Sequence, residues 1–238
     1  ESKFDPKDKG KNVLESSRKQ PHLDSALNTA KSLIISHIPF GIITRKNLGE
    51  LSRYKVIILP EVLMMDEEEV SAFRDYVTSG GRLYASHYTS LLDKDGNKRK
   101  DFMLADVFGV SYIGETKEEV TYISPCQGLS EIFGDVSSEY PLTLFSSQIK
   151  VKPLNKEEVI AYIKLPYTDP SDPARFASIH SNPPGVDTDY PAIIRRRFGE
   201  GEVVWVAGPL EMVEYKTHRE LFIRLIRSLV KEGFSFEV

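Results

Sequence analysis

Cysteine and tryptophan each occur only once among the 238 residues. The lone cysteine, Cys126, cannot form an internal disulfide, so a fold held together by disulfides is excluded. Long apolar runs are also missing, since no stretch approaches the roughly 18 residues needed to cross a bilayer. We therefore expect no membrane partner and a fold that depends on its own packed core.

An excess of one charge sign is missing too. The 31 Lys and Arg residues stand against 35 Asp and Glu residues, which gives a formal net charge of −4. Proteins that bind nucleic acids or anionic membranes carry a basic face, so this balance predicts no nucleic-acid partner. With 40% hydrophobic residues the composition is that of a globular protein with a core.

The first twenty residues lack an apolar period and an initial methionine. Charged side chains dominate this stretch, and it has no apolar centre of the kind a signal peptide needs. We interpret residues 1–20 as a linker or N-terminal arm before a domain at 21–238, in a piece of a longer protein. A cytoplasmic location is favoured, with a secreted or periplasmic parent as the alternative.

Metal and cofactor motifs are missing as well. The five histidines have no paired zinc-ligand spacing, and the one Gly-x-Gly turn, Gly199–Gly201, precedes a predicted strand rather than a helix. A calcium loop counted from Asp93 would need Gly at its sixth position and Glu at its twelfth, but Lys98 and Leu104 stand there. We therefore expect no metal and no cofactor.

A strand–helix–strand unit is the clearest pattern that is present. Tyr54–Leu59 predicts a strand whose continuous apolar run, Val56 to Leu59, is typical of burial on both faces. Asp66 and Glu69 form a capping box for the next helix, and Gly80–Gly81 marks its end. Arg82–Ser86 then predicts a second strand, parallel to the first.

The other predicted elements flank this unit. A helix with an apolar stripe at 3.6-residue spacing precedes it, followed by a short strand at Phe40–Thr44. Val203–Ala207 and Glu214–Val230 predict a buried strand and an amphipathic helix at the end of the chain, and Pro166–Pro191 a long surface loop. The stripe of the first helix, expected to be buried, is Leu23, Ala26, Leu27, Ala30, Leu33 and Ile34.

Polar and aromatic side chains follow the three best strands. Glu61 follows the first, His87 and Tyr88 the second, and Glu211 the last. Ligands bind beyond the carboxyl ends of parallel strands, so these four are candidate ligand-binding residues. The alternative interpretation is that Glu61 and His87 are solvated loop residues.

No residue is expected to be a nucleophile. A nucleophile elbow needs flanking glycines, whereas the stretch around Ser86 and His87 has none. Cys126 lies away from any predicted strand-to-helix junction, and His218 lies on the apolar stripe of the last helix as a core residue. We therefore predict no catalytic residue.

Five runs together resemble a known domain. They are Ala30–Phe40, Leu51–Pro60, Phe73–Ser86, Leu104–Val110 and Gly199–Gly208. In this order and spacing they are similar to the glutamine-amidotransferase-like domain of glycoside hydrolase family 42 β-galactosidases, where it is called the trimerisation domain. Related copies follow the barrel of other bacterial glycoside hydrolases.

The resemblance implies a fold and a role. The fold would be α/β, a flavodoxin-like (class I glutamine-amidotransferase-like) parallel sheet with helices on both faces and a β-rich insertion at about 112–198. The role would be non-catalytic assembly and substrate shaping in a homo-oligomer, as a trimer, beside an upstream barrel. Amidotransferases carry a cysteine at the nucleophile elbow and, after a later strand, a His-Pro-Glu stretch that activates it. In this sequence the elbow falls on Ser86 or His87, and the later site keeps the carboxylate Glu211 but has no histidine. The resemblance therefore implies a degenerate amidotransferase site.

Two alternatives stay open. The chain could be an independent sugar-binding protein or glycosidase that uses a strand-end pocket of Glu61, His87 and Glu211, with a carbohydrate as partner. The loop around Tyr167–Tyr190 could reach a neighbouring subunit, or its aromatic side chains could pack within their own chain.

Overall fold

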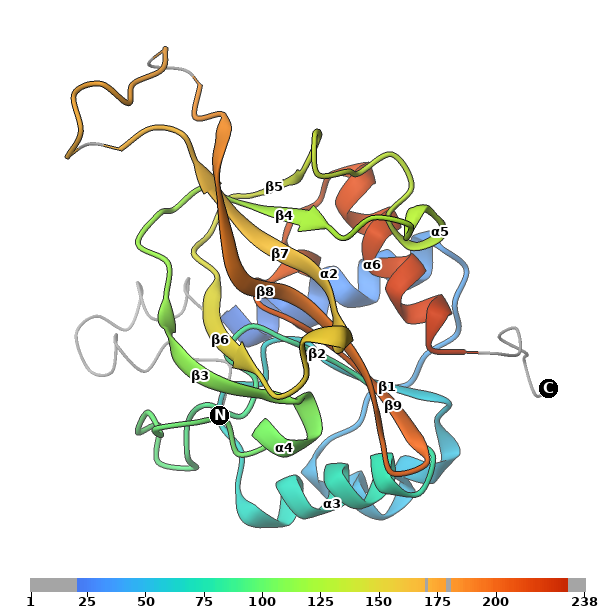
Figure 1. Cartoon of the computed structure of the whole chain (residues 1–238). Coiled ribbons are helices and arrows are strands. Elements are labelled where there is room, and N and C mark those ends of the chain that lie inside the picture. The colour runs from blue at the N-terminus through green and yellow to red at the C-terminus, as the bar shows by residue number, and fades with distance from the viewer. Residues whose placement is uncertain (1–20, 170, 179–180, 231–238) are drawn as a thin grey trace, which may run out of the picture.

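The computed structural model describes residues 21–169, 171–178 and 181–230. Its centre is a seven-stranded sheet with the strand order β1-β2-β9-β8-β7-β4-β5. A separate two-stranded ribbon of β3 (Val110–Glu115) and β6 (Ile149–Pro153) lies beside it (Figure 1). The predicted linker or arm at 1–20 lies outside the described residues.

One end of the sheet is parallel. β1 (Val56–Leu59), β2 (Arg82–Ser86) and β9 (Gly201–Val206) run in the same direction. The predicted strand–helix–strand unit is confirmed, because α3 (Glu67–Thr78) connects β1 to β2. The carboxyl ends of these three strands therefore meet at one edge of the sheet.

The rest of the sheet is antiparallel, through β8 (Pro184–Phe198), β7 (Val159–Pro166), β4 (Thr121–Pro125) and β5 (Leu142–Leu144). The α/β class is correct, but the sheet is mixed and the expected flavodoxin-like parallel sheet is not confirmed. The turn at Gly199–Gly201 joins β8 to β9 directly, whereas a parallel crossover needs a dozen or more residues. Of the strands in the expected insertion at about 112–198, β4, β5, β7 and β8 thus extend the main sheet, whereas β3 and β6 form the separate ribbon.

Helices cover both faces of the sheet. The ring of Tyr84 in β2 meets Phe222 with centroids 5.2 Å apart, while Trp205, one position further along β9, meets Phe102 at 5.7 Å. Successive strand residues point to opposite faces, so these contacts lie on opposite sides of the sheet. The other helical segments are α2 (Pro21–Ile35), α4 (Ala105–Phe108), α5 (Ser130–Phe133), α6 (Lys216–Ser228), η2 (Arg45–Arg53), η3 (Lys156–Glu158) and η4 (Leu210–Met212).

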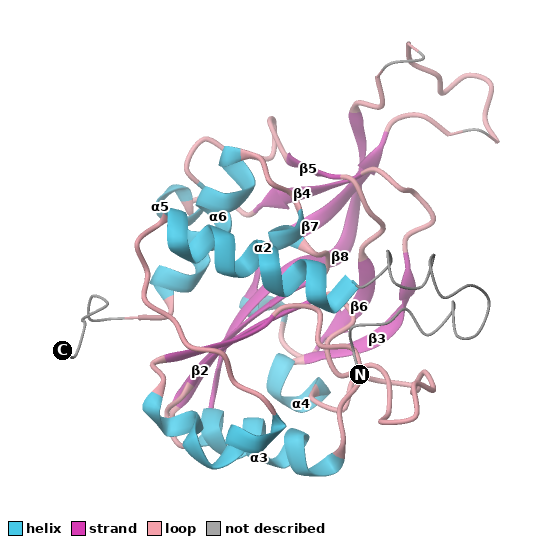
Figure 2. Ribbon diagram, turned by 180° about the vertical axis from the view of Figure 1, so that it is seen from behind, coloured by secondary structure: helices cyan, strands magenta, loops and turns pink. Residues whose placement is uncertain are grey.

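The last helix and α3 follow the predicted patterns, whereas α2 does not. Capping of α3 by Asp66 and Glu69 is confirmed, and the helix buries Val70, Phe73, Tyr76 and Val77. In α2, which lies beside α6 in Figure 2, the expected stripe is wrong. Three of its members are exposed, namely Leu23, Leu27 and Ile34, and the buried residues are Ser25, Thr29, Ser32 and Leu33.

Two further expectations are corrected by the structure. Phe40–Thr44 is not a strand; Phe40 and Ile42 are exposed there and pair with no neighbouring strand. The loop predicted at Pro166–Pro191 is shorter, because β8 already begins at Pro184 and pairs with β7 across several register shifts. The described residues between β7 and β8 (167–169, 171–178 and 181–183) form an arm that projects from the body of the described chain (Figures 1 and 2).

Candidate functional site

The candidate site lies where the three parallel strands end. The structure brings Glu61, His87 and Glu211 together there, as the strand order predicts, and all three side chains are buried. They follow β1, β2 and β9 respectively, with Glu211 in η4. The solvated-loop interpretation of Glu61 and His87 is therefore wrong.

Glu61 and His87 form a buried pair. Nδ1 of His87 lies 2.8 Å from Oε1 of Glu61, and Oγ of Ser25 in α2 donates to Oε2 over 3.0 Å. Burial raises the pKa of Glu61, but the charge and hydrogen bond of His87 and the hydrogen bond of Ser25 outweigh it. The pKa of Glu61 is therefore lowered from 4.5.

Glu211 is the centre of a second buried hydrogen-bond network, which includes Ser86 and Tyr84. Its Oε1 accepts a hydrogen bond from Oγ of Ser86, and its Oε2 accepts one of 3.0 Å from the hydroxyl of Tyr84. Ser86 in turn accepts from the backbone N–H of Glu61 at 3.1 Å, which joins the two networks. Burial raises the pKa of Glu211 to about 7, against these hydrogen bonds.

The backbone at this edge has an unusual conformation. Glu61, His87 and Ser90 have φ angles of 52°, 51° and 65°, in the left-handed region that non-glycine residues seldom adopt. Such conformations cluster where surrounding contacts enforce them, often at functional sites. Of the two elbow candidates, His87 has the left-handed conformation at the strand exit, and Ser86 is the last residue of β2.

Tyr88 covers the site from the side of the β3–β6 ribbon. Its ring lies 4.2 Å from that of His87, and Nζ of Lys98 lies 5.8 Å from its centroid. Burial and the neighbouring Glu115 raise the pKa of Tyr88. Nε2 of His87 is buried and has no hydrogen-bond partner among the described residues, so a ligand hydroxyl or a water molecule could meet it here.

This arrangement is poorly suited to hydrolysis. Each oxygen of Glu61 and Glu211 already accepts a hydrogen bond from a side chain of the same chain. A glycosidase needs one carboxyl group that is free to protonate the glycosidic oxygen and a second that is free to approach the anomeric carbon or an attacking water. The internal hydrogen bonds of Glu61 and Glu211 oppose both roles. Within residues 21–169, 171–178 and 181–230, no group of three His, Cys, Asp or Glu residues could hold a metal ion.

The remaining candidates lie outside the site. Cys126 is a free thiol whose pKa is raised by burial, with Sγ 3.5 Å from the carbonyl oxygen of Val159. His218 is buried in α6 and hydrogen-bonded through Nε2 to the carbonyl of Thr143 at 2.6 Å, in agreement with a core role. Asp93 closes a polar turn by accepting from the backbone of Asp95 and Asn97.

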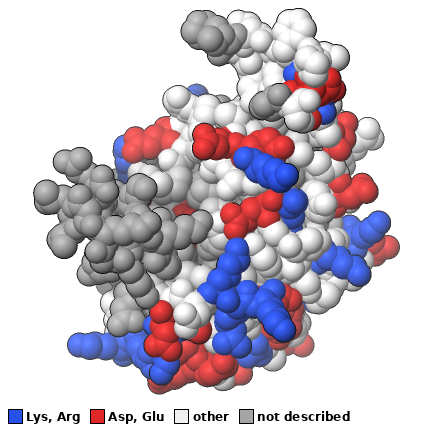
Figure 3. Space-filling view, turned by 90° about the vertical axis from the view of Figure 1, so that its left-hand side faces the viewer, with Lys and Arg blue, Asp and Glu red and all other residues white. Residues whose placement is uncertain are grey.

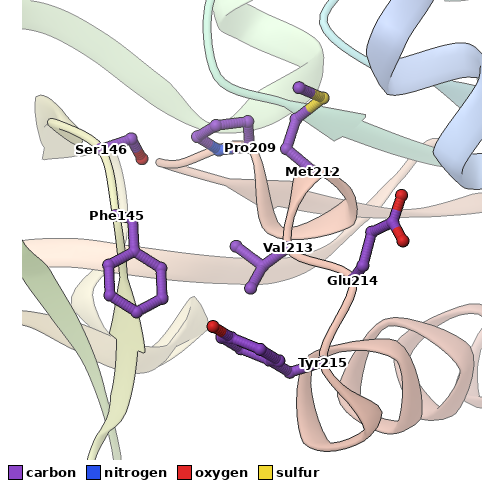
Figure 4. A pocket seen from close by; sticks show the side chains of 7 residues that line it. All are labelled: Phe145, Ser146, Pro209, Met212, Val213, Glu214 and Tyr215. Carbon is purple, nitrogen blue, oxygen red and sulfur yellow. The ribbon is translucent and has the colours of Figure 1, made fainter.

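A surface groove lies next to η4 on the face covered by α2 and α6. It has a volume of about 410 Å³. In Figure 4 the ring of Phe145 and the ring of Tyr215 line it together with Val213, and the ribbon of α2 passes beside Met212 and Glu214. Its lining is Phe145, Ser146, Pro209 and residues 212–215, here called the 209–215 groove.

Two residues of the site escaped sequence reasoning. Ser25 carries no motif and lies on a helix face expected to be exposed, although three polar residues at helical spacing (25, 29 and 32) do mark that face. Tyr84 is an interior strand residue whose hydroxyl reaches Glu211 only through the fold. The short loop between β9 and η4 could not be positioned from sequence either.

The face shown in Figure 3 carries acidic and basic side chains interspersed rather than a field of one sign. None of the described helices is long and apolar enough to span a membrane.

Comparisons with known proteins point to one family. The family model described as the β-galactosidase trimerisation domain matches residues 14–233. A GH42 β-galactosidase from G. stearothermophilus is similar at 17% identity and a TM-score of 0.63, over 90% of this chain and 27% of its own. An α-L-fucosidase isoenzyme from Paenibacillus thiaminolyticus is similar at 18% identity and 0.67, over 89% of this chain and 30% of its own.

A cytoplasmic protein from Salmonella typhimurium is similar over 86% of both chains, at 13% identity and a TM-score of 0.59. At such identities the structural matches establish a shared fold. The chain spans little more than a quarter of the length of the β-galactosidase it matches. Because the family model covers nearly the whole sequence, the chain belongs to the β-galactosidase trimerisation domain family.

Proposed function

We propose that this chain is a non-catalytic assembly domain of a larger glycoside hydrolase, holding copies of that enzyme in a homo-oligomer with a trimer favoured. The observation that carries the proposal is the match to the trimerisation-domain family over residues 14–233. The partner within the same protein would be an upstream barrel that carries the glycosidase site. The cytoplasm is the proposed compartment.

The strand-end site supports the same proposal. By the resemblance, an amidotransferase cysteine would stand at Ser86 or His87, and the left-handed backbone of His87 supports this correspondence; Cys126 lies elsewhere, with a raised pKa. With neither a thiolate nor a free base, the site is proposed to be a degenerate amidotransferase centre in which Glu61 and Glu211 stabilise the strand ends.

Sedimentation of the 238-residue chain, and of the longer protein that contains it, tests the assembly role. We expect a mass of three protomers, and no hydrolysis of glutamine or of aryl galactosides by the 238-residue chain. A protomer mass for both proteins would contradict the proposal. Hydrolysis by this chain that is lost in Glu211→Gln would show instead that it is an enzyme.

Carbohydrate binding is the second candidate. It is favoured by Nε2 of His87, which is buried without a partner among the described residues, beside the ring of Tyr88. A pyranose hydroxyl could bond this nitrogen while the sugar ring packs on the tyrosine. Calorimetric titration with galactose and fucose tests this, with Tyr88→Ala as the control that should abolish any heat of binding.

A further inference from the structure

The imidazole of His87 keeps one nitrogen unused inside the strand-end site. Its Nδ1 lies 2.8 Å from Oε1 of Glu61, and a carboxylate only accepts hydrogen bonds, so Nδ1 donates and Nε2 of the neutral ring carries a lone pair. Nε2 has no hydrogen-bond partner among the described residues, and His87 as a whole is only 6% exposed. A buried acceptor without a partner points to a bound water or ligand. A ligand for this nitrogen must first displace what covers the ring.

Tyr88 lies against this imidazole as a half-buried cover. The two ring centroids are 4.2 Å apart, with their planes tilted by 56°. The backbone that carries Tyr88 is fixed on both sides, because the N–H of His87 donates to the carbonyl of Val206 at 2.8 Å and the N–H of Ser90 donates to that of Val62 at 2.9 Å. Movement of the cover is therefore confined to rotation of the Tyr88 side chain.

A second group of side chains holds the tyrosine in place. The hydroxyl of Tyr88 is hydrogen-bonded to the carboxyl group of Glu115 in β3. Nζ of Lys98 lies 2.9 Å from Oε1 of Glu115 and 2.6 Å from the hydroxyl of Tyr112. Lys98 and Glu115, here called the latch, lie outside the main sheet and are 44% and 28% exposed at their side chains. Ion pairs exposed to this degree are weak, so the latch can open at small cost.

We propose that Tyr88 is a gate over His87 and that the latch of Lys98 and Glu115 holds it closed. Rotation of the tyrosine away from the imidazole exposes Nε2 and leaves the tyrosine ring available to pack on a ligand. The gate deepens the carbohydrate-binding candidate and rests on it for the identity of the ligand, a pyranose hydroxyl on Nε2. Opening is measurable without any ligand, so the gate and the carbohydrate can fail separately.

Diethyl pyrocarbonate measures the opening in the 238-residue chain. The lone pair of Nε2 attacks one carbonyl carbon of the reagent, and an N–C bond forms while a C–O bond of the anhydride breaks. The ethyl carbonate that leaves takes up the proton that the ring gives up and decays to ethanol and carbon dioxide. Peptide mass spectrometry gives the rate at each histidine, with exposed His37 and buried His218 as references within the same chain.

Two variants release the gate by different routes. Lys98→Met removes the ammonium of the latch, and Tyr88→Phe keeps a ring over His87 but loses the bond to Glu115. Lys94→Met is the matched control, since Lys94 is an exposed residue of the same loop. His87 should react at least about threefold faster in both variants than in the parent chain or the control, the factor that a weak ion pair represents. The rates at the two reference histidines should not change.

Other results overturn the gate. They are an unchanged rate at His87 in either variant, a parent chain in which His87 already reacts as fast as His37, or a rise that His218 shares, which would mean general unfolding. Galactose and fucose are then added to Lys98→Met. Slower reaction of His87 with either sugar supports a carbohydrate ligand, whereas no protection by either refutes the carbohydrate and leaves the gate intact.

Discussion

The fold raises the pKa of Glu211, and this shift can be tested through the pH dependence of the free energy of unfolding. Its carboxyl group is buried, with a pKa of about 7 against an unfolded value near 4.5. Between these values the folded state binds a proton that the unfolded state has released. Its contribution to the free energy of unfolding therefore falls as the pH rises from about 4.5 to 7, by roughly 3 kcal/mol in total.

Glu211→Gln should remove this pH dependence. The amide stays neutral, and it can still accept from Ser86 and meet the hydroxyl of Tyr84. Urea unfolding at pH 5, 6, 7 and 8 measures the effect, and the difference between variant and parent should grow in favour of the variant as the pH rises. Parallel pH profiles for the two proteins would contradict the buried, neutral carboxyl.

His87 allows a second test at this scale, because its partner is a buried carboxylate. His87→Ala leaves Glu61 without its charge partner and places Ala at φ 51°, so we expect a loss of about 3 kcal/mol in the free energy of unfolding. His87→Asn should lose clearly less, because Asn tolerates this conformation and its amide can donate to Glu61. If the two variants lose the same free energy of unfolding in chemical denaturation, neither the left-handed backbone conformation nor the hydrogen bond to Glu61 accounts for the loss.

Among the elements, α3 shows what local sequence can predict. The capping box of Asp66 and Glu69 depends on contacts within a few residues, and it is confirmed. The parallel pair on either side of α3 follows from the same unit. Local chemistry and tertiary packing agree here, so the pattern was sufficient.

For α2 and β8 the same reasoning failed. The stripe of α2 predicts a buried face, but Ser25 turns inward to Glu61 and the apolar side stays exposed, which only the position of β1 explains. In β8 the segment from Pro184 pairs with β7 through register shifts that no period-2 pattern reveals. The candidate site was predictable because strand order places Glu61, His87 and Glu211 at one edge, whereas its inner hydrogen bonds were not.

The cap of α3 supports a prediction at the scale of the element. Asp66→Ala removes the bond that the N–H of Glu69 donates to the cap, at 3.0 Å, and should cost about 1 kcal/mol in the free energy of unfolding. Glu68→Ala is the matched control: its ion pair with Arg45 is exposed and should contribute close to zero. Urea denaturation of both variants at pH 7 measures the two losses in the free energy of unfolding. If Glu68→Ala loses as much as Asp66→Ala, the effect comes from the ion pairs with Arg45 and not from the helix cap.

At the scale of the whole molecule, the uncovered surfaces carry the functional argument. At the strand ends, its buried polar residues are hydrogen-bonded to one another, while exposed apolar residues lie on α2, in the 209–215 groove and at several other places, among them Ile42, Tyr140 and Leu154. A family defined by trimerisation gives such surfaces a reason to exist. A closed ring of three needs a heterologous contact, in which each copy contributes two different surfaces, rather than the like-to-like contact of a two-fold dimer.

Ring closure makes assembly cooperative, and this is the last prediction. In a closed ring of three, a dimer holds one contact between copies, whereas a third copy adds two, and the second of these forms within an already tethered complex at high effective concentration. Sedimentation equilibrium over a wide range of protein concentration should therefore fit a monomer–trimer equilibrium with little dimer at any point. A dominant dimer would indicate instead that like surfaces pair across a two-fold axis.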